Sequence, residues 1–213
     1  MIDYEALTQA MGDLDEDTVT EMLNALMAEG GEGAKDALAA CQKGMDQVGK
    51  LFETGEYFVG DLIYAGELMT AAVDILKPAL ITGGVSEKKT QMILCTVKGD
   101  LHDIGKNIVR SMLEAGGFEV LDLGIDVPPE KIVETAKAEN IKIIALSGVL
   151  TLAITAMKTT VEAIKAAGLD CKVIIGGAPV SEAAKAITGA DEWAYSPQKT
   201  VNVCREWADA YGI

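Results

Sequence analysis

The chain is poor in basic and aromatic residues. Among its 213 residues, 18 are Lys or Arg and 33 are Asp or Glu, which gives a formal net charge of -15, and only 5% are aromatic. A surface this negative repels phosphate backbones, so we expect no nucleic acid among the partners. Apolar residues make up 49% of the chain, with many Ala, Gly, Val and Ile, and this composition favours helices packed on a parallel sheet.

The chain also lacks the sequence patterns of zinc sites, secretion and membrane insertion. Its four cysteines are scattered, none of them form a C-x-x-C pair, and there is a single histidine, so they do not supply a zinc site. The acidic N-terminal sequence has no signal-peptide pattern, and no apolar run is long enough to span a bilayer. We therefore expect a soluble, cytoplasmic protein with reduced thiols and no membrane partner.

Residues 1–80 show helical periodicity and no strand pattern. Apolar residues recur at spacings of three or four, and Gly or Pro residues separate the periodic segments. Four helices are expected, at 2–11, 15–29, 32–54 and 57–76, the last stopped by Pro78. Such helices with short turns predict a four-helix bundle, a cap domain over residues 1–80. Residues 77–89 combine proline, paired glycine and charge, and we expect them to form a hinge linker.

From residue 90 onward, apolar strand patterns alternate with helical patterns. Strands are expected at 90–97, 118–122, 142–147, 171–175 and 191–195. Helices are expected at 105–116, 129–139, 152–167, 181–188 and 198–211. This alternation predicts an α/β domain over residues 90–213, a Rossmann-like (flavodoxin-like) five-stranded parallel sheet that binds ligands beyond the carboxyl ends of its strands.

The first loop at that edge carries the residues best suited to chemistry. Asp100, His102 and Gly105 follow the strand at 90–97, and His102 is the only histidine of the chain. A neutral imidazole nitrogen can bind a metal, and a carboxylate on the other nitrogen fixes the tautomer and raises its basicity. Gly105 lets the backbone pass close to a large group. The alternative is that Asp100 or Asp103 only caps the following helix.

Two further loops at the same edge carry hydroxyl or glycine residues. Ser147 and Thr151 lie at the end of the third strand, and either one is also a plausible helix cap. Gly176 and Gly177 follow the fourth strand. The glycine pair fits a tight turn as well as a surface where a bulky ligand lies against backbone.

The spacing of the three loops points beyond these alternatives. The pattern is D-x-H-x-x-G, then 41 residues (106–146), S-x-V, then 26 residues (150–175), then G-G. With this spacing the chain resembles cobalamin (corrinoid)-binding proteins of the methionine synthase module type, in particular the free-standing corrinoid proteins of anaerobic methyltransferase systems. The resemblance covers nearly the whole chain, with a helical cap first and a Rossmann-like corrinoid domain second.

The resemblance implies a role for each motif residue. His102 matches the histidine that binds cobalt from below and displaces the cofactor's own base, the base-off/His-on state, and Asp100 matches its carboxylate partner. These two would be the catalytic residues, and the displaced nucleotide tail would occupy a channel in the sheet domain. The cofactor-binding set would be Asp100, His102, Asp103, Ile104, Gly105, Ser147, Val149, Thr151, Gly176 and Gly177, with Phe52 and Val59 from the cap over the methyl face.

The chain departs from the family at two of these places. Val149 stands where the family usually has Leu, and Ala153 stands where methionine synthase has a serine that extends the His–Asp relay. The resemblance therefore supports an orienting role for Asp100 more than a proton relay. Residues 193–196 lie where the family closes the tail channel.

The resemblance also implies a function. The chain would be a methyl carrier that binds cobalamin or a related corrinoid in its methylcobalamin form. It would accept a methyl group on Co(I) from a substrate-specific methyltransferase and pass it to a second methyltransferase, whose acceptor is tetrahydrofolate or a thiol coenzyme. A reductive activator of Co(II) would be a third partner, and the chain alone would not be a complete enzyme.

Two alternatives belong to other classes. One is a corrinoid-dependent sensor or regulatory module, but no basic helix-turn-helix segment is present, and residues 1–80 are acidic. The other is the B12-binding subunit of a mutase. The four-helix cap disfavours this alternative, because such a cap is expected where a bound methyl group needs shelter.

Overall fold

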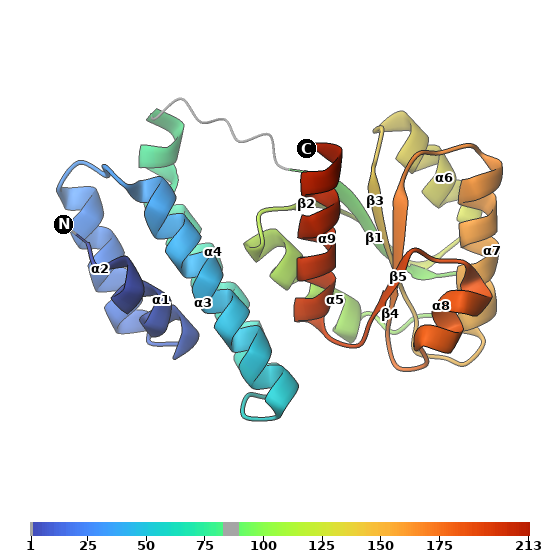
Figure 1. Cartoon of the computed structure of the whole chain (residues 1–213), viewed down its shortest axis with the longest axis horizontal. Helices are drawn as coiled ribbons and strands as arrows, with labels where there is room; N and C mark the ends of the chain where they lie inside the picture. The colour runs from blue at the N-terminus through green and yellow to red at the C-terminus, as the bar shows by residue number, and fades with distance from the viewer. Residues whose placement is uncertain (1, 83–89) are drawn as a thin grey trace. The chain divides into compact units, whose positions relative to one another are not determined.

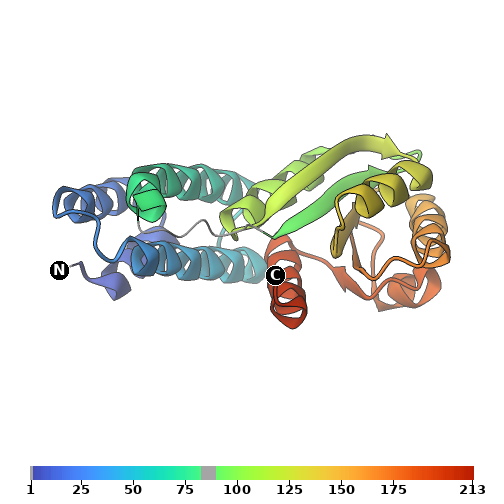
Figure 2. The same ribbon diagram turned by 90° about the horizontal axis from the view of Figure 1, so that it is seen from above.

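The first of two structural units is a bundle of helices. The structure, a computed structural model, describes residues 2–82 and 90–213, and the chain divides into the units Met1–Lys88 and Lys89–Ile213. The first unit contains α1 (Tyr4–Gly12), α2 (Glu16–Ala28), α3 (Ala34–Thr54) and α4 (Val59–Thr82). Because α1 packs on α2 and α3, and α4 packs on α2 and α3, they form the expected four-helix bundle. Figures 1 and 2 both show α3 and α4 lying side by side.

The fourth helix is longer than the sequence pattern indicates. It continues through Pro78 to Thr82, so the prediction that Pro78 stops the helix was wrong. A proline removes one N–H donor and crowds the carbonyl group four residues earlier. Here the packing of the preceding turns, which bury Met69, Ala72 and Leu76, outweighs that local cost. The first part of the predicted hinge is thus helical, and its residues 83–89 lie outside the described residues.

The second unit alternates strands and helices. Its elements are β1 (Gln91–Val97), α5 (Ile104–Ala115), β2 (Glu119–Val127), α6 (Pro129–Ala138), β3 (Ile143–Ser147), α7 (Ala153–Ala166), β4 (Lys172–Gly176), α8 (Glu182–Thr188), β5 (Glu192–Ala194) and α9 (Pro197–Tyr211). All strand pairs are parallel, in the order β2-β1-β3-β4-β5. This is the flavodoxin-like order, and it confirms the predicted doubly wound sheet.

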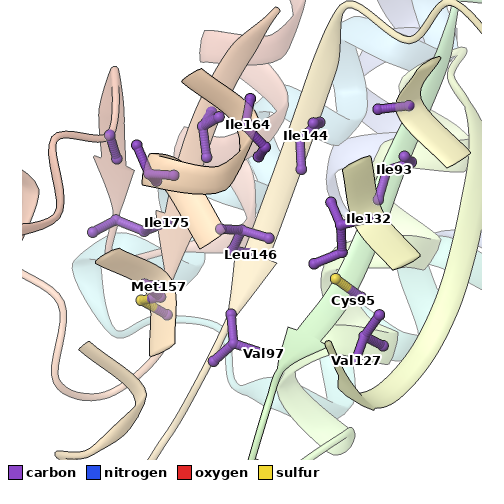
Figure 3. Packing of buried hydrophobic residues seen from close by; sticks show 14 of the residues in the cluster. Ile93, Cys95, Val97, Val127, Ile132, Ile144, Leu146, Met157, Ile164 and Ile175 are labelled. Carbon is purple, nitrogen blue, oxygen red and sulfur yellow. The ribbon is translucent and has the colours of Figure 1, made fainter. Parts of the chain in front are cut away.

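Helices cover both faces of this sheet. In Figures 1 and 2, α6, α7 and α8 lie on one face, and α5 and α9 lie on the other. Alternate strand residues point toward α6 and α7 and form a hydrophobic core with them. Figure 3 shows part of this core, built from Ile93, Cys95, Val97, Ile144, Leu146 and Ile175 of the strands and Ile132, Met157 and Ile164 of the helices.

Strand β2 extends well past the predicted segment 118–122. It reaches Val127, and its register with β1 shifts after Leu94 and again after Cys95. Gly124 (φ +89°) and Asp126 (φ +54°) adopt left-handed conformations in this irregular part. An Asp and a Gly in the sequence normally end a strand, but here the extra residues are accommodated as bulges.

The strand register brings the predicted loops together. Thr96 of β1 is paired with Ser147 of β3, Ser147 with Gly176 of β4, and Gly176 with Ala194 of β5. The carboxyl ends of four strands therefore lie in one row, and the loops that follow them share one edge of the sheet.

Candidate functional site

A buried carboxylate joins the loop after β1 to the loop after β3. The Asp100 side chain is 1% exposed. Its Oδ1 accepts a hydrogen bond from the His102 backbone N–H at 3.0 Å and lies 2.9 Å from His102 Nδ1. Its Oδ2 accepts from the backbone N–H groups of Val149 at 2.7 Å and Leu150 at 3.0 Å. Asp100 therefore binds both loops, and Asp103, at the N-cap of α5, makes no side-chain capping bond.

The hydrogen bonds to Asp100 keep it ionised. Burial alone raises the pKa of this carboxyl, but the backbone N–H groups of Leu150, His102 and Val149 stabilise the charged form more strongly and lower the pKa to about 2. An ionised carboxylate can only accept, so the His102 proton lies on Nδ1. The lone pair of Nε2 is then available to a metal.

The His102 ring projects from the protein edge among apolar side chains. Its side chain is 51% exposed, and Nε2 has no hydrogen-bond partner among residues 2–82 and 90–213. The two loops joined by Asp100 carry exposed apolar side chains, which we call the apolar rim: Leu101, Ile104, Val149, Leu150 and Leu152. The predicted site residue Ile104 belongs to this rim, and exposed apolar surface of this kind marks a binding surface.

A cavity of about 170 Å³ lies between the sheet and the helices α5 and α9. Five of the predicted site residues line it: Gly105, Ser147, Val149, Gly176 and Gly177. Most of the remaining lining is hydrocarbon, from Leu94, Val109, Ala145, Leu146, Ile174, Ile175 and Ala194. The cavity is thus suited to a largely apolar group.

The other predicted residues lie away from this cavity lining. Asp103 and Thr151 are exposed in the loops around His102, and Thr151 is not the N-cap of α7. Phe52, half-buried near the end of α3, and Val59, exposed at the start of α4, belong to the first unit. Phe58, which is not among the predicted site residues, is more exposed than either.

The glycines of the site have different structural reasons. Gly177 has φ +117°, and a Cβ there would lie 2.0 Å from the carbonyl oxygen of Gly148. The close approach of the two loops therefore requires a glycine at this position. A Cβ on Gly105 would meet nothing within 4 Å, and one on Gly176 would meet only the carbonyl oxygen of Ala194, at 3.7 Å. These two glycines keep cavity space free of side chains.

A buried ion pair between Lys106 and Asp122 lies at the cavity wall and was not predicted from the sequence. Lys106 lines the cavity and is 2% exposed. Its Nζ donates to Asp122 Oδ2 and, at 2.8 Å, to Asn107 Oδ1. Burial raises the pKa of Asp122, but the hydrogen bond from Lys106 and other interactions lower it overall, so the carboxylate of Asp122 is ionised. A half-buried aspartate inside a strand needs a charged or hydrogen-bonding partner. The position of Asp122 in an apolar strand pattern was therefore the one sequence feature that could have indicated this pair.

Comparison with known proteins identifies the family. A family model described as a B12 binding domain matches residues 90–197, and a second B12 binding domain model matches residues 4–77. The chain belongs to the B12-binding proteins. The dimethylamine corrinoid protein 1 of Methanosarcina acetivorans is 41% identical to this B12-binding protein over 165 residues, 76% of this chain and 78% of that protein.

Solved structures agree with this assignment. The crystal structure of a cobalamin-binding protein from Desulfitobacterium hafniense DCB-2 is similar with a TM-score of 0.90 and 50% identity, over 97% of this chain and 99% of that chain. The methanol:cobalamin methyltransferase complex from Methanosarcina barkeri has a TM-score of 0.72 at 24% identity, over 94% of this chain and 77% of that chain, and it shares the fold. The predicted family and fold class are confirmed.

The residues of this B12-binding protein fit a corrinoid. A corrinoid would need a donor atom from the protein for its cobalt, and Nε2 of His102 would be able to supply one. The apolar cavity in the same unit would take part of the cofactor, and Gly105 and Gly176 leave its space free of side chains. No helix in the described part of the chain is long and apolar enough to cross a membrane.

Proposed function

We propose that this B12-binding protein is a methyl carrier in which His102 is the protein ligand of cobalt, in the base-off/His-on state. The observation that carries the proposal is the Asp100–His102 pair, whose buried, ionised carboxylate leaves one imidazole nitrogen exposed beside an apolar cavity. Similarity to a dimethylamine corrinoid protein supports the methyl-transfer role. When bound, the corrinoid supplies a cobalt centre that takes up a methyl group and gives it up again.

The residues of the chain bind, orient and shelter. Asp100 fixes the ring of His102 and raises the basicity of Nε2, which favours ligation of a cobalt centre that needs a lower ligand. The apolar rim excludes water from the same face. The cavity lined by Gly105, Ser147 and Gly176 would hold the displaced nucleotide tail.

The helical bundle has the complementary task of covering the methyl face. Phe52 and Val59 are the residues that we assign to this cover, which would have to move aside for methyl transfer. Support comes from the exposed apolar side chains at this end of the bundle, Phe58, Val59 and Ile63. The bundle also matches its own B12 binding domain model, over residues 4–77.

Methyl transfer by this chain requires partner proteins. One methyltransferase would deliver the methyl group from a donor, a second would pass it to an acceptor, and a reductive activator would restore the cobalt centre. The fold shared with a methanol:cobalamin methyltransferase complex agrees with such partners, and the net charge of -15 offers a means of steering them. The four cysteines are free, as in proteins of the cytoplasm, where we place this activity.

Reconstitution with methylcobalamin tests the ligand assignment. Wild-type protein is expected to show a base-off/His-on visible spectrum, and His102→Ala is expected to lose the His-on features and to bind roughly 10–100-fold more weakly. Ser111→Ala, on an exposed position of α5, is the matched control and should resemble wild type. If His102→Ala keeps the wild-type spectrum and affinity, another group holds the cobalt.

A further inference from the structure

The main chain that carries His102 is fixed from the end of strand β2. Thr96 is completely buried, and its hydroxyl donates to the Asp100 carbonyl oxygen at 2.5 Å. The backbone N–H of Asp126 points to the same place, 3.1 Å from that carbonyl oxygen and 2.9 Å from Thr96 Oγ1. The carbonyl group of Asp100 therefore has two donors, both outside its own loop.

The side chain of Asp126 holds the other end of the same segment. Its Oδ1 accepts from the Gly99 backbone N–H at 2.7 Å, and its Oδ2 accepts from Lys98 Nζ at 3.1 Å. The first of these bonds is the larger reason that the pKa of Asp126 is lowered, so the carboxylate is ionised and can only accept. Asp126 thus contacts the N–H group of Gly99 and the C=O group of Asp100, which lie three and two residues before His102.

The conformation of Asp126 supports a dedicated role. Its φ of +54° is left-handed, a conformation that disfavours most side chains and is tolerated best by Gly, Asn and Asp. It lies within the second register shift of the β1–β2 ladder, and its N–H points to Thr96 of β1. Strained backbone that is held by several specific bonds is frequent at functional sites.

We propose that Asp126, acting with Thr96, is a positioning residue that sets how firmly His102 binds cobalt. The inference rests on the proposed function, because it assumes that His102 is the ligand. An imidazole that is half exposed is oriented by its own loop, and Asp126 and Thr96 hold the main chain of that loop in place. Loosening this segment widens the distribution of ring positions and weakens the cobalt–nitrogen bond.

Two substitutions at position 126 separate the side chain from the backbone conformation. Asp126→Asn keeps an acceptor for Gly99 and tolerates the left-handed φ, so it should stay close to wild type. Asp126→Gly keeps the φ but removes the acceptor, and we expect the ratio of His-on to His-off protein to fall by about tenfold. Lys98→Ala removes only the exposed ion pair and should leave the ratio unchanged.

Two readouts follow these variants. With the bound corrinoid reduced to Co(II), electron paramagnetic resonance counts the fraction in which a nitrogen of the protein is coupled to cobalt. In the protein without corrinoid, hydrogen exchange at the amides of Gly99 and His102 should quicken in Asp126→Gly and stay slow in Asp126→Asn. Thermal unfolding establishes that each variant is folded. If Asp126→Gly is not folded, Thr96→Val replaces it, with the same expected fall.

The outcomes distinguish the inference from the proposed function. If wild-type protein shows no nitrogen coupling from His102, the proposed function fails and the inference fails with it. If wild type is His-on and Asp126→Gly has the wild-type ratio, the proposed function stands and the inference is overturned. A fall in Asp126→Asn equal to that in Asp126→Gly also overturns it, because the acceptor would then be irrelevant.

Discussion

The buried carboxylate of Asp100 links the stability of the site to pH. Its pKa is about 2 in the folded protein against an ordinary value of 3.8, so it favours folding above about pH 4, by about 2 kcal/mol, and this contribution is lost as pH falls toward 2. Asp100→Asn has no such dependence. The difference in free energy of unfolding between wild type and variant should shrink by about 1 kcal/mol between pH 7 and pH 3.

Urea denaturation of the protein without corrinoid measures this difference. Other carboxyl groups with lowered pKa values, such as Asp122 and Asp126, are present in both proteins and cancel in the comparison. A difference that stays constant over this pH range would show that the carboxylate of Asp100 is not preferentially ionised in the fold.

Single residues differ in how far the sequence could identify them. His102 and Asp100 were predicted because their spacing to Ser147 and to Gly176 is distinctive. The structure places the carboxyl ends of the strands that precede these three loops in one row. Asp126 and Lys106 were not found. Their contacts depend on bulges in β2 and on the packing of α5 against that strand, and neither leaves a periodic pattern.

At the scale of elements, the second residue of helix α5 is Gly105, which lines the cavity and lowers the stability of the helix. Gly105 has room for a Cβ, and its φ is not left-handed. Gly105→Ala should therefore raise the free energy of unfolding by about 0.5 kcal/mol. The added methyl group would lie in the cavity that we assign to the nucleotide tail, so corrinoid affinity should fall by about tenfold, or about 1.4 kcal/mol.

Chemical denaturation and corrinoid titration measure the two effects separately. Ser111→Ala, also in α5 but away from the cavity lining, should be slightly stabilised with unchanged affinity. Equal affinity for wild type and Gly105→Ala would show that the tail does not reach this helix.

The elements themselves were largely predictable. The alternation of apolar strands with amphipathic helices was sufficient to predict the doubly wound sheet and the bundle, since hydrophobic periodicity dominates both. Two boundaries were wrong, at Pro78 and after residue 122, because tertiary packing and strand pairing overrode the local signals of Pro, Asp and Gly.

At the scale of the whole molecule, we expect the two units to have separate roles, the sheet unit in binding the corrinoid and the bundle in sheltering it. The core of the sheet unit, its cavity and the Asp100–His102 pair all lie within residues 90–213. We expect residues 90–213, produced alone, to unfold cooperatively and to bind methylcobalamin with a His-on spectrum. Without the bundle, the bound methylcobalamin should lose its methyl group in light several times faster than in the full chain, as measured by the decay of its visible spectrum.

Failure of this fragment to fold would show that the bundle contributes to the stability of the sheet unit. Equal photolysis rates in fragment and full chain would contradict the sheltering role assigned to Phe52 and Val59.

The two carboxylate oxygens of Asp100 accept hydrogen bonds from backbone amides that are 47 or more positions apart in the sequence. One oxygen binds the amide of His102, and the other binds the amides of Val149 and Leu150. One buried side chain therefore links the two loops that contain these amides. We expect a displacement of the His102 ring to pass through the Asp100 carboxylate to the neighbouring loop and to shift the exposed side chains of Val149 and Leu150. A partner protein that contacts those side chains would therefore respond to whether His102 is bound to cobalt, without contacting the metal itself.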